Sequence, residues 1–450
     1  MKVCSLYGAG FYYIPGTDIC MKIGGYVRFQ ESFGHLDSTG GPFTAGVGFN
    51  NRIASANQIY RNRYILTHDT RQQTAYGTLR TYMILGFSSD SNLASANAAG
   101  IYSTRAFIQI AGFTFGKATS YFDFVSTAAV AYNAGSLSAP DTGDGGAIVA
   151  AYTAQLGNGF SATLSFEQER QRGTNYLGVP GTGAGALAAD NLGGGNQLQD
   201  IVGQLRLDQA WGSAAVAVAA HNISGGYFGA NEQLGHPGDE WGYAVTAGLR
   251  LNAPMFGPGD FFQIAGVYAE GATRYASNTP GAFVRKDGGF VGFQFVDDGG
   301  YSGTIAIPGI FEKTTSWSVM ASYEHFWTPS LRTSLYGSYF DISRNDTLNN
   351  ALCLSGLALG TQLTGQAANR AAGCDLDSSY WAVGSRSQWN VTKDLYVGLD
   401  VIYSKLNSAK LNAAGTATLA AGNGVAAGLY RIDDQDAVSA TWRIHRDIVP

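Results

Sequence analysis

The feature that most constrains this chain is a strict alternation of apolar and polar side chains. It holds over segments of about ten residues that recur along the whole chain. In residues 21–30, for example, Ile23 and Val27 occupy one face and Lys22 and Arg28 the other. A period of two is typical of β-strands, because successive side chains point to opposite faces. No apolar run approaches the roughly 18 residues that a membrane-spanning helix needs. The sequence therefore predicts an all-β fold.

The number of segments and the composition favour a barrel in a membrane. We count about sixteen strands, joined alternately by short and long connections, which is typical of outer-membrane barrels. Only 14% of residues are charged, against about a quarter in soluble domains. A sheet in lipid must close, because open edges leave peptide groups unpaired. We therefore predict a transmembrane antiparallel β-barrel, with residues 1–450 forming one domain. The alternative, a soluble β-propeller, would show blade repeats, and we find none.

Aromatic residues recur near the ends of the predicted strands. In a membrane barrel they would form girdles at the two interfaces with water. The residues are Trp317, Trp327, Trp381, Trp389, Phe113, Phe160 and Phe261.

One connection differs from the others in its small-residue composition. We expect a strand over residues 105–116, a second short strand over 117–124, and then a loop over 125–147. We hypothesise that this loop folds into the barrel lumen and narrows it. The alternative is an ordinary surface loop, since most loops lie on surfaces.

Charged residues on the inward faces are the main candidates for function. A charge on the lipid face at mid-membrane costs roughly 2–4 kcal/mol, so alternation places these residues in the lumen. From the first strands they are Lys22, Arg28, Arg61, Arg63, Arg71, Arg80 and Arg105. We predict that they face the acids Asp123, Asp141 and Asp144 across a water-filled gap, creating a field that screens solutes by charge. The alternative is that they only solvate the wall.

The sign of the ion preference stays open at this point. The net charge of −5 favours cations, whereas the arginines favour anions. Alternation also points further arginines inward, so the basic lining need not be confined to one side. They are Arg206, Arg250, Arg332, Arg386 and Arg443.

Signals for chemistry are weak. The sequence has no HExxH, GxSxG or Walker motif, and GTGAGA at 181–186 follows no predicted strand and opens no helix. We therefore expect no enzyme activity, no cofactor and no metal. No basic stripe stands out, so nucleic acid is not an expected partner.

The four cysteines form two groups that are local in sequence, Cys4 with Cys20 and Cys353 with Cys374. Three pairings are formally possible, and local pairing is the simplest. Disulfides would imply an oxidising compartment. Free thiols are the alternative.

Four stretches carry a resemblance to a known family. They are VCSLYGAGFYYIPGTDICMKIGGYVRFQ from Val3, THDTRQQTAYGTLRTYM, AFIQIAGFTFGKATSYFDF and ATWRIHRD. Together they resemble the alphaproteobacterial porins of rhizobial and related bacteria. The resemblance implies a trimeric, sixteen-stranded diffusion porin of the bacterial outer membrane. Its third extracellular loop, residues 125–147 here, would form the constriction. It also implies a periplasmic segment at residues 1–19 and a disulfide between the cysteines that flank YIPGTD, Cys4 and Cys20.

The resemblance leads us to expect a general porin, through which small hydrophilic solutes and ions diffuse passively. The expected partners are two further copies of the chain, membrane lipid and lipopolysaccharide. One alternative is a substrate-selective channel with a binding site along an aromatic or arginine track. Another is a closed barrel with a structural or adhesive role. The chain shows no signal peptide and ends in HRDIVP rather than on an aromatic residue, so we expect a trimmed or re-started chain.

Overall fold

The computed structural model describes the greater part of the chain. The described residues are 4–36, 46–49, 56–91, 99–170, 174–177, 197–227, 232–236, 238–277, 283–304, 307–354, 363–365, 367, 369–422 and 425–449.

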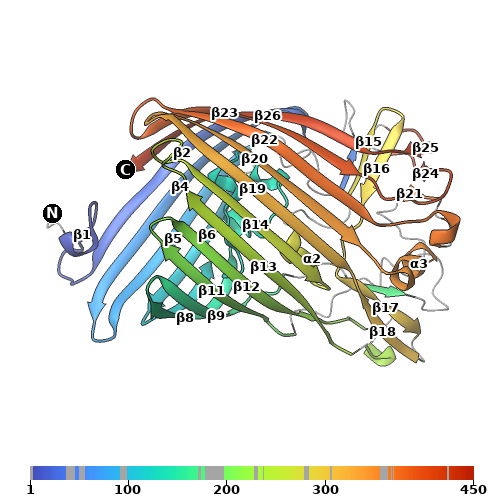
Figure 1. The fold of residues 1–450 in the computed structure, drawn as a ribbon, viewed down its shortest axis with the longest axis horizontal. Coiled ribbons are helices and arrows are strands. Elements are labelled where there is room, and N and C mark those ends of the chain that lie inside the picture. The colour runs from blue at the N-terminus through green and yellow to red at the C-terminus, as the bar shows by residue number, and fades with distance from the viewer. Residues whose placement is uncertain are drawn as a thin grey trace.

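A closed antiparallel β-barrel forms the body of the molecule (Figure 1). Its strands are β2 (Cys20–Leu36), β4 (Ala56–Thr74), β5 (Gly77–Asp90), β6 (Ala99–Ile110), β7 (Phe113–Ala118), β8 (Ala147–Gly157), β9 (Phe160–Glu167), β11 (Asp200–Gln209), β12 (Gly212–Ile223), β13 (Glu240–Asn252), β14 (Phe261–Glu270), β19 (Thr315–Thr328), β20 (Leu331–Ser343), β22 (Ser378–Asn390), β23 (Leu395–Asn407) and β26 (Gln435–Val449). Each strand pairs with the next, and β26 pairs with β2 to close the barrel of sixteen strands. The prediction of an all-β barrel is confirmed.

The remaining elements are not among the sixteen strands of the wall. At the N-terminal end they are η1 (Ser5–Tyr7) and the two-residue β1 (Tyr12–Tyr13), and within the loop after β7 they are η2 (Thr127–Ala129), η3 (Ala134–Ser136) and η4 (Gly143–Gly145). The long connections carry β3 (Gly46–Phe49), β10 (Thr174–Leu177), η6 (Glu232–Leu234), α2 (Thr273–Ala276), β15 (Phe283–Asp287), β16 (Phe290–Gln294), β17 (Gly299–Thr304), β18 (Ile307–Lys313), α3 (Asp346–Leu354), β21 (Leu363–Thr364), η8 (Arg370–Ala372), β24 (Thr416–Leu419) and β25 (Gly428–Ile432). Most of those that Figure 1 labels gather at one end of the barrel, opposite the two termini, whereas α2 lies deeper, beside β13 and β14.

One predicted boundary is wrong. Residues 105–116 do not form a single strand, because the chain reverses at Ala111 and Gly112, which both take positive φ (50° and 86°). This turn joins β6 to β7, which pair antiparallel. The predicted strand over 117–124 is therefore only the end of β7, and the loop begins at residue 119.

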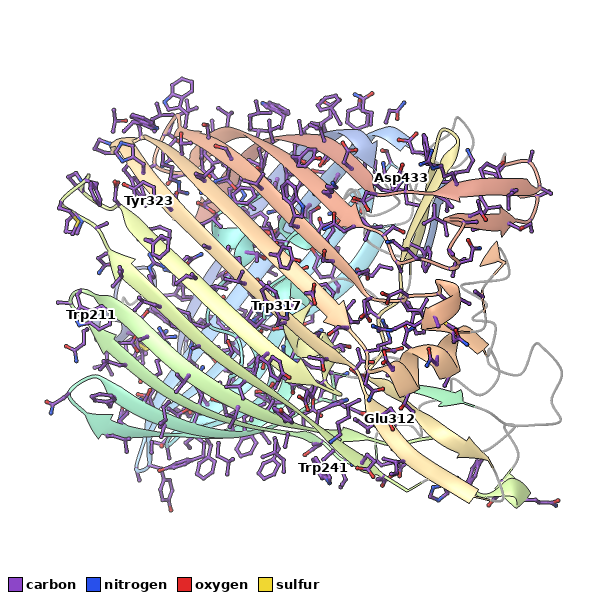
Figure 2. The ribbon with its side chains drawn as sticks, turned by 45° about the vertical axis from the view of Figure 1, so that its right-hand side comes forward. Trp211, Trp241, Glu312, Trp317, Tyr323 and Asp433 are labelled. Atoms are coloured by element: carbon purple, nitrogen blue, oxygen red, sulfur yellow. A yellow bond between two sulfur atoms is a disulfide. The ribbon has the colours of Figure 1, made fainter. Side chains whose placement is uncertain are left out.

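Aromatic side chains cover both rims of the outer surface (Figure 2). Trp211 lies beside the short β11–β12 connection, whereas Trp241 and Trp317 lie near the long-loop ends of β13 and β19. All three are 40–43% exposed, as expected for side chains that meet the membrane interface. Phe261 does not belong to the girdle: it is 8% exposed and lies under the guanidinium of Arg250, with 4.0 Å between Cζ and the ring centroid.

Both local cysteine pairs are disulfides, Cys4–Cys20 and Cys353–Cys374, as the simplest pairing predicted. The first ties the N-terminal segment to the start of β2. The second joins α3 to the segment after η8 in a long connection. Among the described residues, no helix has the length and apolarity needed to cross a membrane.

Candidate functional site

The loop of residues 119–146 turns into the barrel, as hypothesised, and reaches the far wall. At its tip, the backbone N–H groups of Tyr132 and Asn133 donate to Oδ2 of Asp400 on β23, at 2.5 and 3.2 Å. Asp400 is fully buried, and its other oxygen accepts from the hydroxyl of Tyr336 on β20. A surface loop could not make these contacts, so the inward prediction is confirmed.

Further wall residues hold the backbone carbonyls of the loop. Ser334 donates to the carbonyl of Val130 at 2.6 Å, and Tyr380 to that of Ser136 at 2.7 Å. These bonds satisfy peptide groups that would otherwise be buried without partners. They come from two strands, β20 and β22, so they fix the path of the loop as well as its end.

Tyr132 is the centre of the anchored tip. The guanidinium of Arg443 on β26 stacks on its ring, with Cζ 3.9 Å from the centroid, and that of Arg386 lies 5.5 Å away. Gly398 provides the space for the ring, because a Cβ there would come within 2.1 Å of the Tyr132 hydroxyl. Two of the inward arginines predicted from alternation thus hold the loop.

Apolar packing fills the lumen on the side of β11 to β22. Phe122 and Leu137 of the loop are fully buried there. On β12 to β14 the facing wall positions include many small residues, which leave room for the loop, whereas β19 and β20 contribute large side chains such as Met320, Tyr336 and Phe340. The small residues are Ala217, Ala219, Ala244, Ala265 and Ala269.

The opposite side of the lumen, the inward face of β2, β4, β5 and β6, is charged and solvated. We call it the arginine wall. Arg61 pairs with Asp90 at 2.7 Å, and Asp69 pairs with both Arg71 and Arg80 at 2.9 Å. The side chains of these three arginines remain 22–29% exposed. A water-accessible space therefore remains beside this wall.

The other predicted arginines also lie on this wall. Arg28 lies over the ring of Tyr26 at 5.3 Å, and Arg63 over that of Tyr102 at 5.7 Å. Arg105 touches the loop, since it donates to the Thr119 hydroxyl at 3.0 Å and the Gly143 carbonyl at 3.3 Å. It thus links the arginine wall to the base of the loop.

Asp123 and Asp141 do not pair with the arginine wall, contrary to the prediction. Asp123 accepts from the N–H and hydroxyl of Thr142 at 2.7 and 2.6 Å, and it pairs with Arg170 at 2.8 Å. Asp141 accepts from Thr127 and from the N–H of Gly143.

Both carboxylates thus stabilise the loop itself, because buried carboxylates need hydrogen-bond donors close by. Burial, and next the neighbouring Asp123 carboxylate, raise the pKa of Asp141. The backbone of Asp144 lies in η4, but its side chain is outside the described part of the structure.

Sequence reasoning missed Arg170 and the role of Asp400. Alternation does place Asp400 on the inward face of its strand, but its partners on the loop are about 270 residues away. Within the described residues, no group of three or more His, Cys, Asp or Glu side chains could hold a metal ion.

A closed sixteen-stranded barrel with aromatic rims, a solvated charged wall and a loop folded through its lumen defines the class of outer-membrane β-barrels. The profile of the Porin subfamily matches residues 1–440. The chain belongs to this family, and its location is the bacterial outer membrane.

Individual relatives are similar in sequence to this chain over part of its length. The porin Omp2b of Brucella melitensis is 32% identical over 231 residues, which cover 50% of this chain and 57% of that protein. Omp2b of Brucella suis matches equally, and that of Brucella canis is 30% identical over the same length. Each match therefore spans little more than half of the relative's length.

Among solved structures, the outer membrane channel DcaP of Acinetobacter baumannii has a TM-score of 0.58 and 13% sequence identity. The comparison covers 97% of this chain and 99% of that one. At this identity the likeness concerns the fold alone.

Proposed function

We propose that this chain is a passive diffusion channel for small hydrophilic solutes and ions, with the loop of residues 119–146 as its constriction. The observation that carries the proposal is the asymmetry of the lumen. The loop packs tightly on the small-residue side, while Arg61, Arg71 and Arg80 on the other side stay solvent-accessible. Solutes would pass between the loop and the arginine wall.

We propose further that this passage prefers anions. Asp69 faces two arginines and Asp90 one, so this set of ion pairs carries a net positive charge. Asp141 accepts hydrogen bonds from Thr127 and Asp123 from Thr142, and Asp123 also pairs with Arg170, so neither carboxylate pairs with an arginine of the wall. A charged lining selects ions of the opposite sign.

Reversal potentials across a planar bilayer with a KCl gradient test both proposals. Arg80→Gln takes the Asp69 group from a net charge of +1 to zero and should shift the reversal potential toward cations. Lys393→Gln, an exposed residue in the short β22–β23 connection, removes the same charge away from the wall and serves as control. If the folded protein does not conduct, the barrel is closed and the channel proposal is wrong. If the wild type and both variants give equal reversal potentials, Arg80 does not line the path of the ions.

The working unit that we propose is a homotrimer. The outer face of β2 and β4 carries polar side chains where lipid would be expected: Gln58 donates to Glu31 and to the hydroxyl of Tyr60. Gln58 and Tyr60 are exposed. Such groups are costly against lipid, so we place another copy of the chain against this face, with lipid and lipopolysaccharide around the remaining belt. Light scattering of mildly extracted protein should give three copies, and Tyr60→Lys should give monomers; a monomeric wild type contradicts the proposal.

A further inference from the structure

Three aromatic rings follow one another across neighbouring strands on the inward face of the barrel. They belong to Tyr26 on β2, His445 on β26 and Tyr396 on β23, with ring centroids 4.4 and 4.5 Å apart. We call them the aromatic ladder. The ring of Tyr132, at the tip of the loop, continues it 6.4 Å from that of Tyr396 and at an angle of 22°. The ladder lies on the inner side of the anchored tip, because Tyr396 is nearer than Asp400 to the short-turn start of β23.

The ladder is accessible from the lumen. Tyr26 and Tyr396 are half-buried and occupy inward positions of their strands. Both rings pack on His445. Tyr26 also lies under the guanidinium of Arg28, with 5.3 Å between Cζ and the centroid, and Tyr396 lies beside Tyr132. Because these neighbours cover the ring faces, a solute in the lumen meets the ring edges, which attract the face of another aromatic ring.

Two arginines beside the ladder form no ion pair within the described part of the chain. Arg28 is half-buried, and its Nε has no hydrogen-bond partner there. Its cross-strand neighbours are Arg63 and His445, neither of which is an acid. Arg443 is 6% exposed and donates to the side chain of Gln30 at 2.9 Å, and its Nε is likewise unpartnered among the described residues.

The charges of Arg28 and Arg443 therefore add instead of cancelling. After burial, repulsion from Arg28 is the largest influence on the charge of Arg443. The acids of this region are engaged elsewhere: Asp447 pairs with His445 at 3.1 Å, and Asp400 accepts from the loop tip. A negatively charged solute beside the two guanidinium groups would relieve their repulsion.

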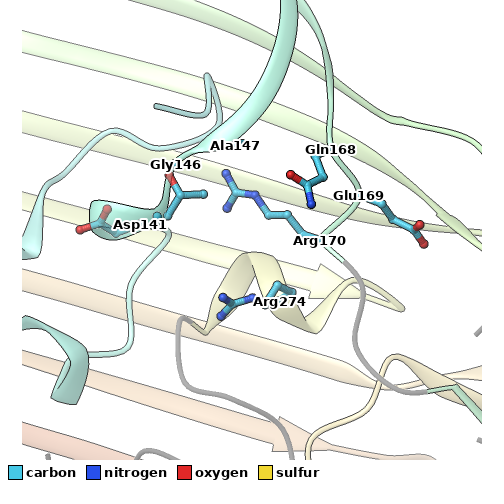
Figure 3. A pocket seen from close by; sticks show the side chains of 9 residues that line it. Asp141, Gly146, Ala147, Gln168, Glu169, Arg170 and Arg274 are labelled. Carbon is cyan, nitrogen blue, oxygen red and sulfur yellow. The ribbon is translucent and has the colours of Figure 1, made fainter. Parts of the chain in front are cut away.

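Another pair of neighbouring arginines lacks this property. Arg170 and Arg274 line a cavity at the base of the loop (Figure 3). The buried carboxylates of Asp123, Glu167 and Asp298 act on them and compensate their charge. The arginines beside the aromatic ladder are therefore the better place for an anion.

We propose that Arg28, Arg443 and the aromatic ladder form a binding site for small aromatic carboxylates on the inner side of the constriction. The guanidinium fork of Arg28 donates two parallel hydrogen bonds to the carboxylate, while the solute's ring lies across the edges of Tyr26 and Tyr396. Arg443 is nearly buried and contributes its charge. The site is open to the lumen, as a channel requires, since binding must be weak enough for the solute to leave. This inference rests on the proposed channel function and names the anions that the passage favours.

Block of chloride current by benzoate and by cyclohexanecarboxylate tests the site. The two solutes have the same charge and rings of similar size, but only benzoate is aromatic. In planar bilayers at about pH 7, where carboxylates are ionised, both should reduce the chloride conductance in a saturable manner, benzoate at the lower concentration. Arg28→Gln should raise both half-blocking concentrations about tenfold, the equivalent of about 1.4 kcal/mol. Tyr396→Leu should weaken block by benzoate about threefold and leave block by cyclohexanecarboxylate unchanged. Tyr26→Leu should act in the same way and replaces Tyr396→Leu if that variant does not fold.

Arg250→Gln is the matched control. Arg250 is also an inward arginine without an ion pair among the described residues, but it stacks on Phe261 on the far side of the barrel. Its replacement should change neither block. The proposal is overturned if benzoate and cyclohexanecarboxylate block the wild type equally, or if Arg28→Gln and Arg250→Gln have the same effect.

Failure of the channel proposal looks different, because the folded protein would then carry no chloride current at all. Calorimetric titration of the detergent-solubilised protein with benzoate decides in that case. Binding heat that Arg28→Gln reduces and Arg250→Gln does not would support the site. No binding heat, or heat that both variants change alike, would refute it.

Discussion

The anchoring of the loop tip by Asp400 can be tested by removing its carboxylate. Asp400→Ala deprives two backbone N–H groups, of Tyr132 and Asn133, and the hydroxyl of Tyr336 of their acceptor. A buried donor left without a partner costs roughly 1–3 kcal/mol. Lumen water can satisfy part of this loss, so we take the low end, about 3 kcal/mol for the three groups. That corresponds to an increase of about 100-fold in the undocked tip.

The base of the loop should stay in place in this variant. Phe122 and Leu137 are fully buried against the wall, and burying such side chains contributes roughly 1.5–3 kcal/mol each. We therefore expect a hinged tip rather than an emptied lumen. Single-channel records of Asp400→Ala should show frequent current fluctuations that the wild type lacks. Liposome swelling should admit larger sugars.

Asp260→Ala is the matched control for Asp400→Ala. Asp260 is 2% exposed and accepts from Tyr323, His325 and the N–H of Phe326 at 2.6–2.8 Å, near the short-turn end of the barrel. Asp260→Ala also leaves three donors without their acceptor, but Asp260 does not contact the loop. This variant should therefore lower the thermal stability and leave the current without extra fluctuations. The reasoning is refuted if the two variants give the same noise, or if Asp400→Ala conducts like the wild type.

Three further outcomes follow from the geometry. Gly398→Ala should displace Tyr132 and reproduce the fluctuations of the undocked tip, measured in the same recordings; a quiet channel would contradict the close packing. Burial raises the pKa of Glu169 to about 7, so its carboxyl gains negative charge as the pH rises through that value; the anion preference measured from reversal potentials should then fall, and Glu169→Gln should abolish this pH dependence. Reducing the disulfide Cys353–Cys374, which closes a loop of 21 residues, should destabilise that connection by about 3 kcal/mol. This should speed its proteolysis while the melting temperature of the barrel stays unchanged; equal digestion before and after reduction would show that the bond is not a constraint.

Alternation predicted the strands well because it is a local signal. Each strand exposes one face to lipid and one to the lumen, so the pattern at Ile23 and Lys22 determines the orientation of that strand without knowledge of its neighbours. The same rule placed Arg80 and Asp400 inside. It misread residues 105–116, because a two-residue turn through Ala111 and Gly112 leaves the alternation almost uninterrupted.

The roles of the loop acids could not be predicted in this way. Asp123 and Asp141 lie in a segment without a period, and their partners are set by the fold of the loop. Arg170, which pairs with Asp123, lies 47 residues away in sequence, just after β9. A charge in an irregular segment can face the pore or stabilise the segment, and only the donors around it decide between these two roles.

The composition of the wall offers a signal for the side on which a lumen loop docks. Inward positions of β12 to β14 are mostly small, such as Ala217, Ala244 and Ala265, whereas those of β2 to β6 carry arginine and tyrosine. A loop gains packing only where the wall leaves room. Its tip already buries the guanidinium groups of Arg386 and Arg443, and docking against β2 to β6 would require it to desolvate several more. The loop therefore docks on the alanine side, and water and solutes remain beside the arginines. By this argument, enlarging Ala244 to Leu should push the loop toward the arginine wall and lower the conductance, while Ala210→Leu in the short β11–β12 connection should not; equal conductance in both variants would show that wall volume does not set the passage.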